Sequence, residues 1–370
     1  MDCNIERLAA MYPALITAGM VSMGIFYSLA GTIQWMYGWP NKPGYRKYIE
    51  GMYPRRVYCL TIALLGMLRY IQYTKLYIQC NSLYKSLNDS NKGITFGRHG
   101  NKLDVFIPKY QGFDQSSTYL PVIIFIYGGA WGSGQRATYC LLALQVATEL
   151  NAVVICPDYS IYPKGSVVEM VQDVTDSISW IKENGNRYNC DKDRIIFIGH
   201  SAGAHLCALT TLFLAGENEE LGIDKMKQND LLASVKGFIG LSGVYHIANH
   251  YKHEQWRGIE YVSTMQRAMK GIDHFDHYSP TLVVNSLPRE RLRRLPRFAL
   301  LHGTKDKIVP VDSTVKFSHA LTFASGDVAL HLLPEIDHIN IIMDLMDSKR
   351  KYYHLLFGYF KREIDTFLNK

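Results

Sequence analysis

The sequence predicts an α/β fold in which helices flank a mostly parallel sheet, with a hydrophobic helical region ahead of it. Three observations support this prediction. From about residue 94 onward, strand-like and helix-like stretches alternate along the chain. Near the middle, an apolar strand pattern runs into the pentapeptide GHSAG (residues 199–203) and then into an apolar helix pattern. Near the start, no charged residue occurs from Leu8 to Asn41.

The chain has 370 residues, of which 48% are hydrophobic and 20% are charged. This balance excludes a disordered chain and leaves room for one large domain and an appendage. The formal net charge is +7, but the chain has no long run of Lys and Arg and no nucleic-acid-binding motif. We therefore expect no nucleic-acid partner. Residues 1–80 form a predicted membrane-anchor region, and residues 94–370 form the predicted main domain.

Seven cysteines are scattered along the chain without the spacing of a metal site. Cys156 and Cys207 lie in apolar runs, where a buried thiol is expected rather than half of a disulfide. The sequence predicts neither a metal nor a cofactor, and it favours a reducing environment for the main domain.

The stretch from Ala14 to Gly31 is apolar or small throughout, and the aromatic residues Trp35, Tyr37 and Trp39 follow it. A helix needs roughly 20 apolar residues to cross a bilayer, and Trp and Tyr are enriched at membrane interfaces. A cleaved signal peptide is the main alternative, but the apolar part is too long and no basic segment precedes it. We expect a membrane-anchoring helix, with the lipid bilayer as a partner.

Five basic residues follow between residues 42 and 56. Because basic flanks stay in the cytosol, a single span would place the main domain there. The segment Val57–Leu68 is apolar but short, and it is either an interfacial helix or a second span that continues through Tyr73. A second span would place the main domain in the lumen, where the sequon Asn88-Asp89-Ser90 could be glycosylated. The sequence leaves both topologies open.

The main domain contains seven predicted strands and several amphipathic or apolar helices. The strands are Leu103–Ile107, Val122–Tyr127, Ala152–Cys156, the apolar run after Arg194, Val235–Leu241, Phe298–Leu301 and Val328–Leu333. The helices are Ala137–Glu149, Val167–Lys182, the run that follows GHSAG, and Tyr352–Leu368. Between Gly243 and Pro296 the pattern is irregular, which is typical of an insertion that shapes a substrate pocket or of an ordinary surface loop.

A strand, the pattern G-x-S-x-G and a helix together are the context of a nucleophile elbow. A side chain at Gly199 or Gly203 would collide with neighbouring backbone, and the turn would hold the serine on strained φ/ψ above helix N–H groups. A serine between glycines is more often part of a simple turn, but the flanking strand and helix favour catalysis. Ser201 is the expected nucleophile. His200 fills the variable position, and we count it among the residues around the substrate.

A serine nucleophile needs a base to take its proton and a carboxylate to orient that base. In the α/β-hydrolase fold the chain order is Ser, then Asp or Glu, then His. Asp306 lies just past a predicted strand, where parallel sheets place ligand-facing groups; the alternative is that it only caps the next helix. His338 follows the next strand. We expect Asp306 as the acid, His338 as the base, His331 as structural, and His302 beside the acid.

Acyl transfer also needs backbone N–H donors for the oxyanion, each worth roughly 10²–10³ in rate. Gly128 and Gly129 follow a predicted strand at the place where lipases and esterases carry His-Gly-Gly-Gly. We expect the N–H groups of Gly129, Ala130 and Ala202 to hold the oxyanion.

Two residues of this loop depart from the pattern or allow two interpretations. Tyr127 replaces the usual His, so the sequence does not say how the loop is braced. Trp131 is expected to line the substrate pocket, with a position in the core as the alternative.

Five segments together carry a family resemblance: GHSAGAHL (199–206), YGGAW (127–131), PDYSIYPKGSVVEMVQDV (157–174), LSGVYHIANHYKHEQWRG (241–258) and DHFDHYSPT (273–281). They resemble the isoprenylcysteine alpha-carbonyl methylesterase family, a membrane-attached branch of the α/β-hydrolases, from about Ile94 to the C-terminus. The resemblance implies hydrolysis of the methyl ester of a prenylated C-terminal cysteine at an endomembrane, such as the endoplasmic reticulum or Golgi. It implies the same catalytic set of Ser201, Asp306 and His338.

Two other functions compete with this one. An amide hydrolase resembling the kynurenine formamidases would share GHSAGAHL and the Pro-Lys-Gly pattern, but those enzymes are soluble and the apolar N-terminal stretch argues against them. A hydrolase fold kept as an inert membrane scaffold usually loses its Ser or His, whereas this chain has all three triad candidates.

Overall fold

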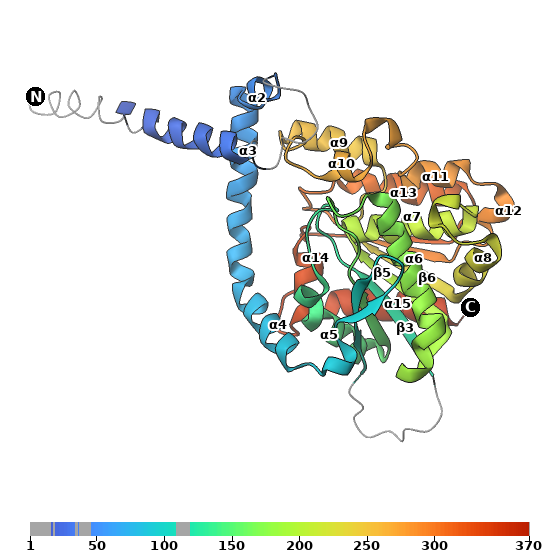
Figure 1. The fold of residues 1–370 in the computed structure, drawn as a ribbon. Helices are drawn as coiled ribbons and strands as arrows, with labels where there is room; N and C mark the ends of the chain where they lie inside the picture. Colours follow the sequence, from blue (N-terminus) through green and yellow to red (C-terminus); the bar gives the residue numbers. More distant parts are fainter. Residues whose placement is uncertain (1–15, 18, 34–35, 37–45, 109–118, 370) are drawn as a thin grey trace, which may run out of the picture. The chain divides into compact units, whose positions relative to one another are not determined.

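The computed structural model describes residues 16–17, 19–33, 36, 46–108 and 119–369 (Figure 1). The chain divides into two compact units. The first unit comprises Met1–Gln72 and Tyr251–Thr264, and the second comprises Tyr73–His250 and Met265–Lys370. A piece of the irregular region between Gly243 and Pro296 therefore belongs to the N-terminal unit.

The second unit is built on an eight-stranded sheet in the order β1-β2-β4-β3-β5-β6-β7-β8. The pairs β1–β2 and β2–β4 are antiparallel, and the other neighbouring pairs are parallel. The strands are β1 (Ile94–Phe96), β2 (Asn101–Phe106), β3 (Leu120–Ile126), β4 (Val153–Pro157), β5 (Cys190–His200), β6 (Val235–Leu241), β7 (Arg297–Gly303) and β8 (Val328–Leu333). The mostly parallel sheet predicted from the alternation of strands and helices is confirmed.

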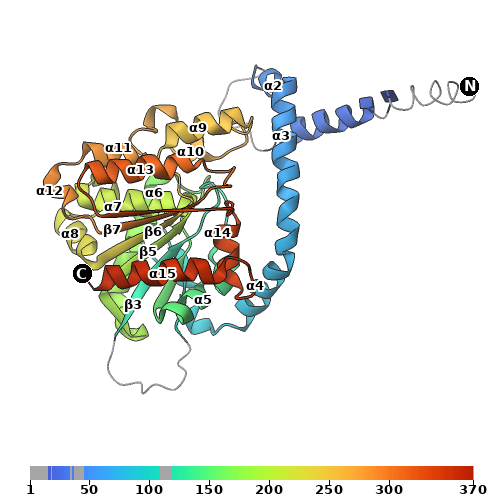
Figure 2. The same cartoon turned by 180° about the vertical axis from the view of Figure 1, so that it is seen from behind.

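Helices cover both faces of this sheet, which explains why its central strands are apolar on both sides. The sequence of β3, LPVIIFI, is buried along nearly its whole length. As Figures 1 and 2 show, α6 and α7 lie on one face and α15 on the other, where it packs with α5. The longer helices are α4 (Thr74–Ser86), α5 (Cys140–Leu150), α6 (Val167–Asn184), α7 (Ala202–Gly216), α8 (Lys225–Ser234), α13 (Val311–Phe323) and α15 (Tyr353–Leu368).

The predicted strands Val235–Leu241 and Val328–Leu333 have the bounds that the structure shows. The strand before GHSAG is longer than its apolar core, because it also includes the polar residues after Cys190. The short edge strand β1 was not predicted. The irregular region contains the short helices α9 (Ile247–Trp256), α10 (Met265–Ala268), α11 (Pro280–Ser286) and α12 (Arg289–Leu292) rather than plain loop.

The first unit has a small apolar centre of its own. Residues 19–33 are helical, and α2 (Arg46–Gly51), α3 (Pro54–Met67) and the 3-10 turn η1 (Leu68–Tyr73) follow. Ala30, Val57 and Leu60 are buried together, with Ile259 packed against them. The Arg56 guanidinium pairs with Glu260 in the same unit.

No helix within the described residues has both the length and the apolar character needed to cross a membrane. The predicted anchor Ala14–Gly31 is described only in part, since residues 14, 15 and 18 lie outside the described residues, as do Trp35, Tyr37 and Trp39. Large apolar side chains of this stretch are exposed: Ile16, Met20, Val21, Met23, Ile25, Phe26 and Leu29. The segment Val57–Leu68, for which two interpretations were open, belongs mainly to α3.

The two cysteines expected to be buried thiols are buried and free. Burial raises the pKa of Cys156 and of Cys207 well above the ordinary value. It also raises the pKa of Cys190 to about 12.

Candidate active site

Ser201 occupies the tight turn between β5 and α7 that the G-x-S-x-G pattern predicts. Its backbone has φ 54° and ψ −118°, a conformation that a side chain rarely tolerates. A Cβ on Gly203 would lie 2.1 Å from the carbonyl oxygen of Ile126, and one on Gly199 would lie 2.6 Å from Ala204 Cα. Both glycines are therefore required by close backbone approach, as expected, and Ser201 is presented at the carboxyl end of β5.

Asp306 and His338 are brought together from the loops that follow β7 and β8. His338 Nδ1–H donates to Asp306 Oδ2 at 2.6 Å, and both side chains are buried. Burial alone would raise the pKa of Asp306, but the neighbouring His338 and His302 hold that pKa well below its usual range. The carboxylate is therefore ionised and fixes the proton on Nδ1 of His338, which leaves Nε2 available as a base.

The residue before the predicted nucleophile touches the predicted base. His200 Nε2–H donates to the backbone oxygen of His338 at 3.0 Å, and the two rings lie 4.8 Å apart. Burial, followed by the proximity of His338, lowers the pKa of His200 to about 3. This neutral imidazole connects the elbow after β5 to the histidine loop after β8.

Asp306 also stabilises its own loop, but it does not cap the next helix, which was the competing interpretation, because the N-cap residue of α13 is Pro310. Its second oxygen, Oδ1, accepts hydrogen bonds from the N–H groups of Ile308 and Val309 at 2.8 and 2.9 Å. His302 lies beside it, with Nε2 3.3 Å from Asp306 Oδ2. His331, expected to be structural, is paired with Glu363 on α15.

The loop Gly128–Gln135, here called the oxyanion loop, lies against the elbow. A Cβ on Gly128 would lie 2.9 Å from Ser201 Cβ, so only glycine permits this approach. The loop has positive φ at Gly129 (143°), Ala130 (50°) and Trp131 (59°). Ala202 begins α7, where the first N–H groups of a helix have no partner within the helix. The assignment of the N–H groups of Gly129, Ala130 and Ala202 as oxyanion donors stays a prediction.

The structure shows which side chains hold the oxyanion loop in place, given that Tyr127 replaces the usual histidine. Tyr127 OH donates to Asp158 Oδ1 at 3.0 Å, and Arg136 N–H donates to the same oxygen at 2.8 Å. The Arg136 guanidinium also pairs with Asp158 and, at 2.9 Å, with the buried Asp104. One carboxylate, that of Asp158, thus ties together the two ends of the oxyanion loop.

Trp131 is buried, with 1% of its surface exposed, and its Nε1–H donates to His205 Nδ1 at 3.1 Å. These are the contacts of a core side chain, which was the second of the two interpretations of Trp131. His205 was not identified from the sequence. A histidine four positions after Ser201, in a mostly apolar helix whose other polar residues are two threonines, is the signal that could have identified it.

Burial of His205 predicts acid sensitivity, because burial lowers its pKa to about 4. The unfolded chain, with a histidine pKa near 6.5, binds more protons than the folded chain between about pH 4 and 6.5, so stability falls as the pH falls through this range. We expect His205 alone to lower the free energy of unfolding by roughly 1.5 kcal/mol when the pH falls from 6.5 to 5. Urea unfolding of the wild type and of His205→Gln at both pH values measures it. An equal loss in both proteins would contradict the prediction.

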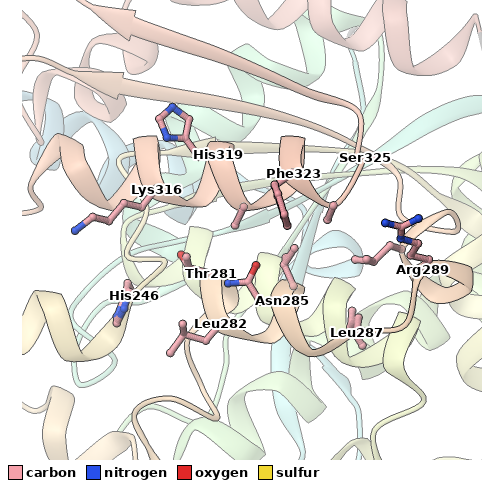
Figure 3. Close-up of a pocket in the computed structure, with 14 residues that line it drawn as sticks. His246, Thr281, Leu282, Asn285, Leu287, Arg289, Lys316, His319, Phe323 and Ser325 are labelled. Carbon is pink, nitrogen blue, oxygen red and sulfur yellow. The ribbon is translucent and has the colours of Figure 1, made fainter.

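A separate cavity, with a volume of about 690 Å³, lies between α11 and α13. Figure 3 shows the side chains that line it. Its lining includes Thr281, Asn285, Lys316 and Phe323 but none of Ser201, Asp306 and His338. Within the described part of the chain, no group of three or more His, Cys, Asp or Glu residues could hold a metal ion.

A sheet of this order, with a serine elbow after β5, an aspartate loop after β7 and a histidine loop after β8, defines the α/β-hydrolase fold. A family model described as BD-FAE matches residues 103–321. The chain belongs to the BD-FAE family.

The curated relatives are named as esterases. The chain is 33% identical over 243 residues to a probable isoprenylcysteine alpha-carbonyl methylesterase, ICME, of Oryza sativa subsp. japonica, covering 66% of this chain and 56% of that protein. It is 31% identical over 269 residues to a probable methylesterase of the same description, ICMEL2, of Arabidopsis thaliana, covering 72% of this chain and 61% of that protein. The chain thus spans about three fifths of the length of these two relatives.

Among solved structures, the fold is similar to that of an esterase from Pyrobaculum calidifontis. The TM-score is 0.59 at 18% identity, over 81% of this chain and 92% of that chain. This likeness concerns the fold, and it confirms the α/β-hydrolase architecture that the sequence predicted.

Proposed function

We propose that the chain is a serine carboxylesterase in which Ser201 is the nucleophile, His338 the general base and Asp306 the residue that orients His338. The observation that carries this proposal is the buried hydrogen bond of 2.6 Å between His338 and Asp306, joined through His200 to the strained serine turn. An elbow serine, an aspartate and a histidine, in this chain order, are the catalytic set of the α/β-hydrolase fold, and such a triad performs acyl transfer.

In the proposed reaction, Ser201 Oγ attacks the ester carbonyl carbon while Nε2 of His338 takes its proton. The N–H groups of Gly129, Ala130 and Ala202 stabilise the negative charge on the carbonyl oxygen. When the tetrahedral intermediate collapses, the imidazolium protonates the leaving alcohol. A water molecule, deprotonated by His338, then hydrolyses the acyl-enzyme and restores Ser201.

The substrate that we propose is the methyl ester of a prenylated C-terminal cysteine, so that methanol is the alcohol released. Support comes from the names of the two plant relatives and from the family resemblance of five segments. We also propose that the N-terminal region attaches to an endomembrane, of the endoplasmic reticulum or Golgi. Its exposed apolar side chains support this, because burial of such surface in lipid favours membrane binding.

The test is methanol release from a farnesylcysteine methyl ester by the purified full chain in detergent, with N-formylkynurenine and p-nitrophenyl butyrate assayed in parallel. We expect the prenylcysteine ester to give the highest kcat/KM. Faster turnover of N-formylkynurenine would replace the proposal with a formamidase. Hydrolysis of p-nitrophenyl butyrate alone would keep the carboxylesterase and reject the prenylcysteine substrate, and inactivity on all three would reject the enzyme.

A further inference from the structure

We propose that His205 is a positioning residue that holds the oxyanion loop against the nucleophile helix, so that its removal lowers kcat rather than substrate binding. The inference rests on the proposed esterase function. It gives His205 and Trp131 a role in holding the oxyanion loop, which is separate from the proposed roles of Ser201, Asp306 and His338 and from the proposed substrate.

His205 joins three segments that are far apart in the sequence. It lies on α7, one turn after the serine elbow, and its N–H donates to the backbone oxygen of Ser201 at 3.1 Å. Its Nδ1 accepts from Nε1–H of Trp131, in the oxyanion loop, at 3.1 Å. Its Nε2–H donates to the backbone oxygen of Tyr278, where the chain returns from the insertion after β6, at 2.8 Å.

The partners of His205 determine its protonation state. The indole N–H of Trp131 can only donate a hydrogen bond, and the carbonyl oxygen of Tyr278 can only accept one. The imidazole must therefore be neutral, with its proton on Nε2. Because the side chain is fully buried, neither of its ring nitrogens can exchange its partner for water without opening the core.

The oxyanion loop needs such a support, because its backbone is held in an unfavourable conformation. Ala130 and Trp131, neither of them glycine, have φ of 50° and 59°. A conformation of this kind costs on the order of 1–3 kcal/mol per residue and persists only when its surroundings enforce it. The side chain of Trp131 is the contact through which α7 can enforce it. The adjacent N–H groups of Gly129 and Ala130 are the proposed oxyanion donors.

Asp158 and His205 hold different parts of the same loop. Asp158 contacts Tyr127 and Arg136, which flank the loop, whereas His205 contacts Trp131 in its middle. If the middle of the oxyanion loop relaxes while Tyr127 and Arg136 stay fixed, the N–H donors of the loop move relative to Ser201 and the domain remains folded. A displaced donor weakens the transition state more than the bound substrate, because the charge on the oxygen develops only during the reaction.

The experiment measures kcat and KM for p-nitrophenyl butyrate with the full chain carrying Trp131→Phe, His205→Leu or His205→Gln. Trp131→Phe removes only the indole donor, and His205→Leu removes both ring nitrogens. Since one oxyanion donor is worth roughly 10²–10³ in rate, we expect a partly displaced pair to lower kcat about 10- to 100-fold with KM changed less than about 3-fold. His205→Gln retains an acceptor and a donor, and we expect it to recover most of the activity.

A second readout separates positioning from general damage to the fold. Ser201 Oγ adds to the carbonyl carbon of a trifluoromethyl ketone while its proton passes to Nε2 of His338, and the former carbonyl oxygen carries the negative charge. The inhibition constant of this ketone should rise in proportion to the fall in kcat/KM. The matched control is Thr211→Val on the same helix, which removes a buried hydrogen bond of 2.8 Å to Cys207 and should leave kcat unchanged.

The outcomes distinguish this inference from the proposed function. One outcome would overturn the role of His205. In it, the wild type is active, Trp131→Phe and His205→Gln both fold, and Trp131→Phe keeps the kcat and the inhibitor affinity of the wild type. An equal loss of kcat in Thr211→Val would also overturn it, because general destabilisation of α7 would then explain the effect. A wild type inactive on every ester would overturn the proposed function and the inference with it. If His205→Leu does not fold, Trp131→Phe and His205→Gln decide the question.

Discussion

Ser201→Ala is expected to lower the kcat for ester hydrolysis by at least about 10⁴-fold, because the covalent route through the serine oxygen is lost. The oxyanion donors and substrate binding would remain, so a small residual rate above the uncatalysed reaction is expected. The fold should be retained, since alanine fits the same turn and no side-chain cap from Ser201 to α7 is lost. Steady-state hydrolysis of p-nitrophenyl butyrate and labelling by a fluorophosphonate probe measure the effect.

The control for this change is Ser177→Ala, which removes a buried serine hydroxyl on α6 that donates to Val174. It should keep both hydrolysis and probe labelling. Labelling that persists in Ser201→Ala would show that another residue is the nucleophile, and the assignment of the elbow would then be wrong.

Asp306→Asn should lower kcat by roughly 10⁴-fold with little effect on folding. The amide oxygen of asparagine can still accept from the N–H groups of Ile308 and Val309, so the turn after β7 is maintained. The amide can also present its NH₂ to His338 Nδ1, and it then favours the tautomer with the proton on Nε2. That imidazole cannot take the serine proton.

Asp337→Asn is the matched control, because Asp337 adjoins His338 in sequence. Its Oδ1 accepts from the N–H groups of Ile339 and Asn340, which asparagine can also do. We expect kcat within about 3-fold of the wild type, as for a substitution outside the reacting groups. A large loss in Asp337→Asn together with a small one in Asp306→Asn would reverse the choice of acid.

The sheet was predictable because most of its strands have a hydrophobic pattern that can be recognised in the sequence of each strand alone. Runs such as Val122–Tyr127 are apolar on both faces and lie between turn residues, and this pattern is sufficient to predict a buried parallel strand. The edge strand β1 has three residues and one buried side chain, so it leaves almost no pattern. The helices of the insertion are short, and residues 251–264 within it belong to the first unit, which local periodicity does not reveal.

The proximity of Asp306 and His338 was predictable from strand ends, since the sequence places both residues just past two strands that pair side by side. The residues that hold the oxyanion loop in place could not be predicted in this way. Asp158 and Arg136 are far from Ser201 in sequence and belong to no motif that requires them. His205 forms its bonds with residues 74 and 73 positions away. Such contacts depend on the three-dimensional packing of loops, and a single sequence records no trace of them.

The thiols of Cys156, Cys190 and Cys207 are expected to react poorly with alkylating reagents while the chain is folded. Each is buried and has a pKa above the ordinary value, whereas alkylation requires an accessible thiolate. Serine-directed and cysteine-directed reagents should therefore report on different events in this protein. The first reports an assembled catalytic centre, and alkylation of these three thiols reports the moment at which the interior is exposed to solvent.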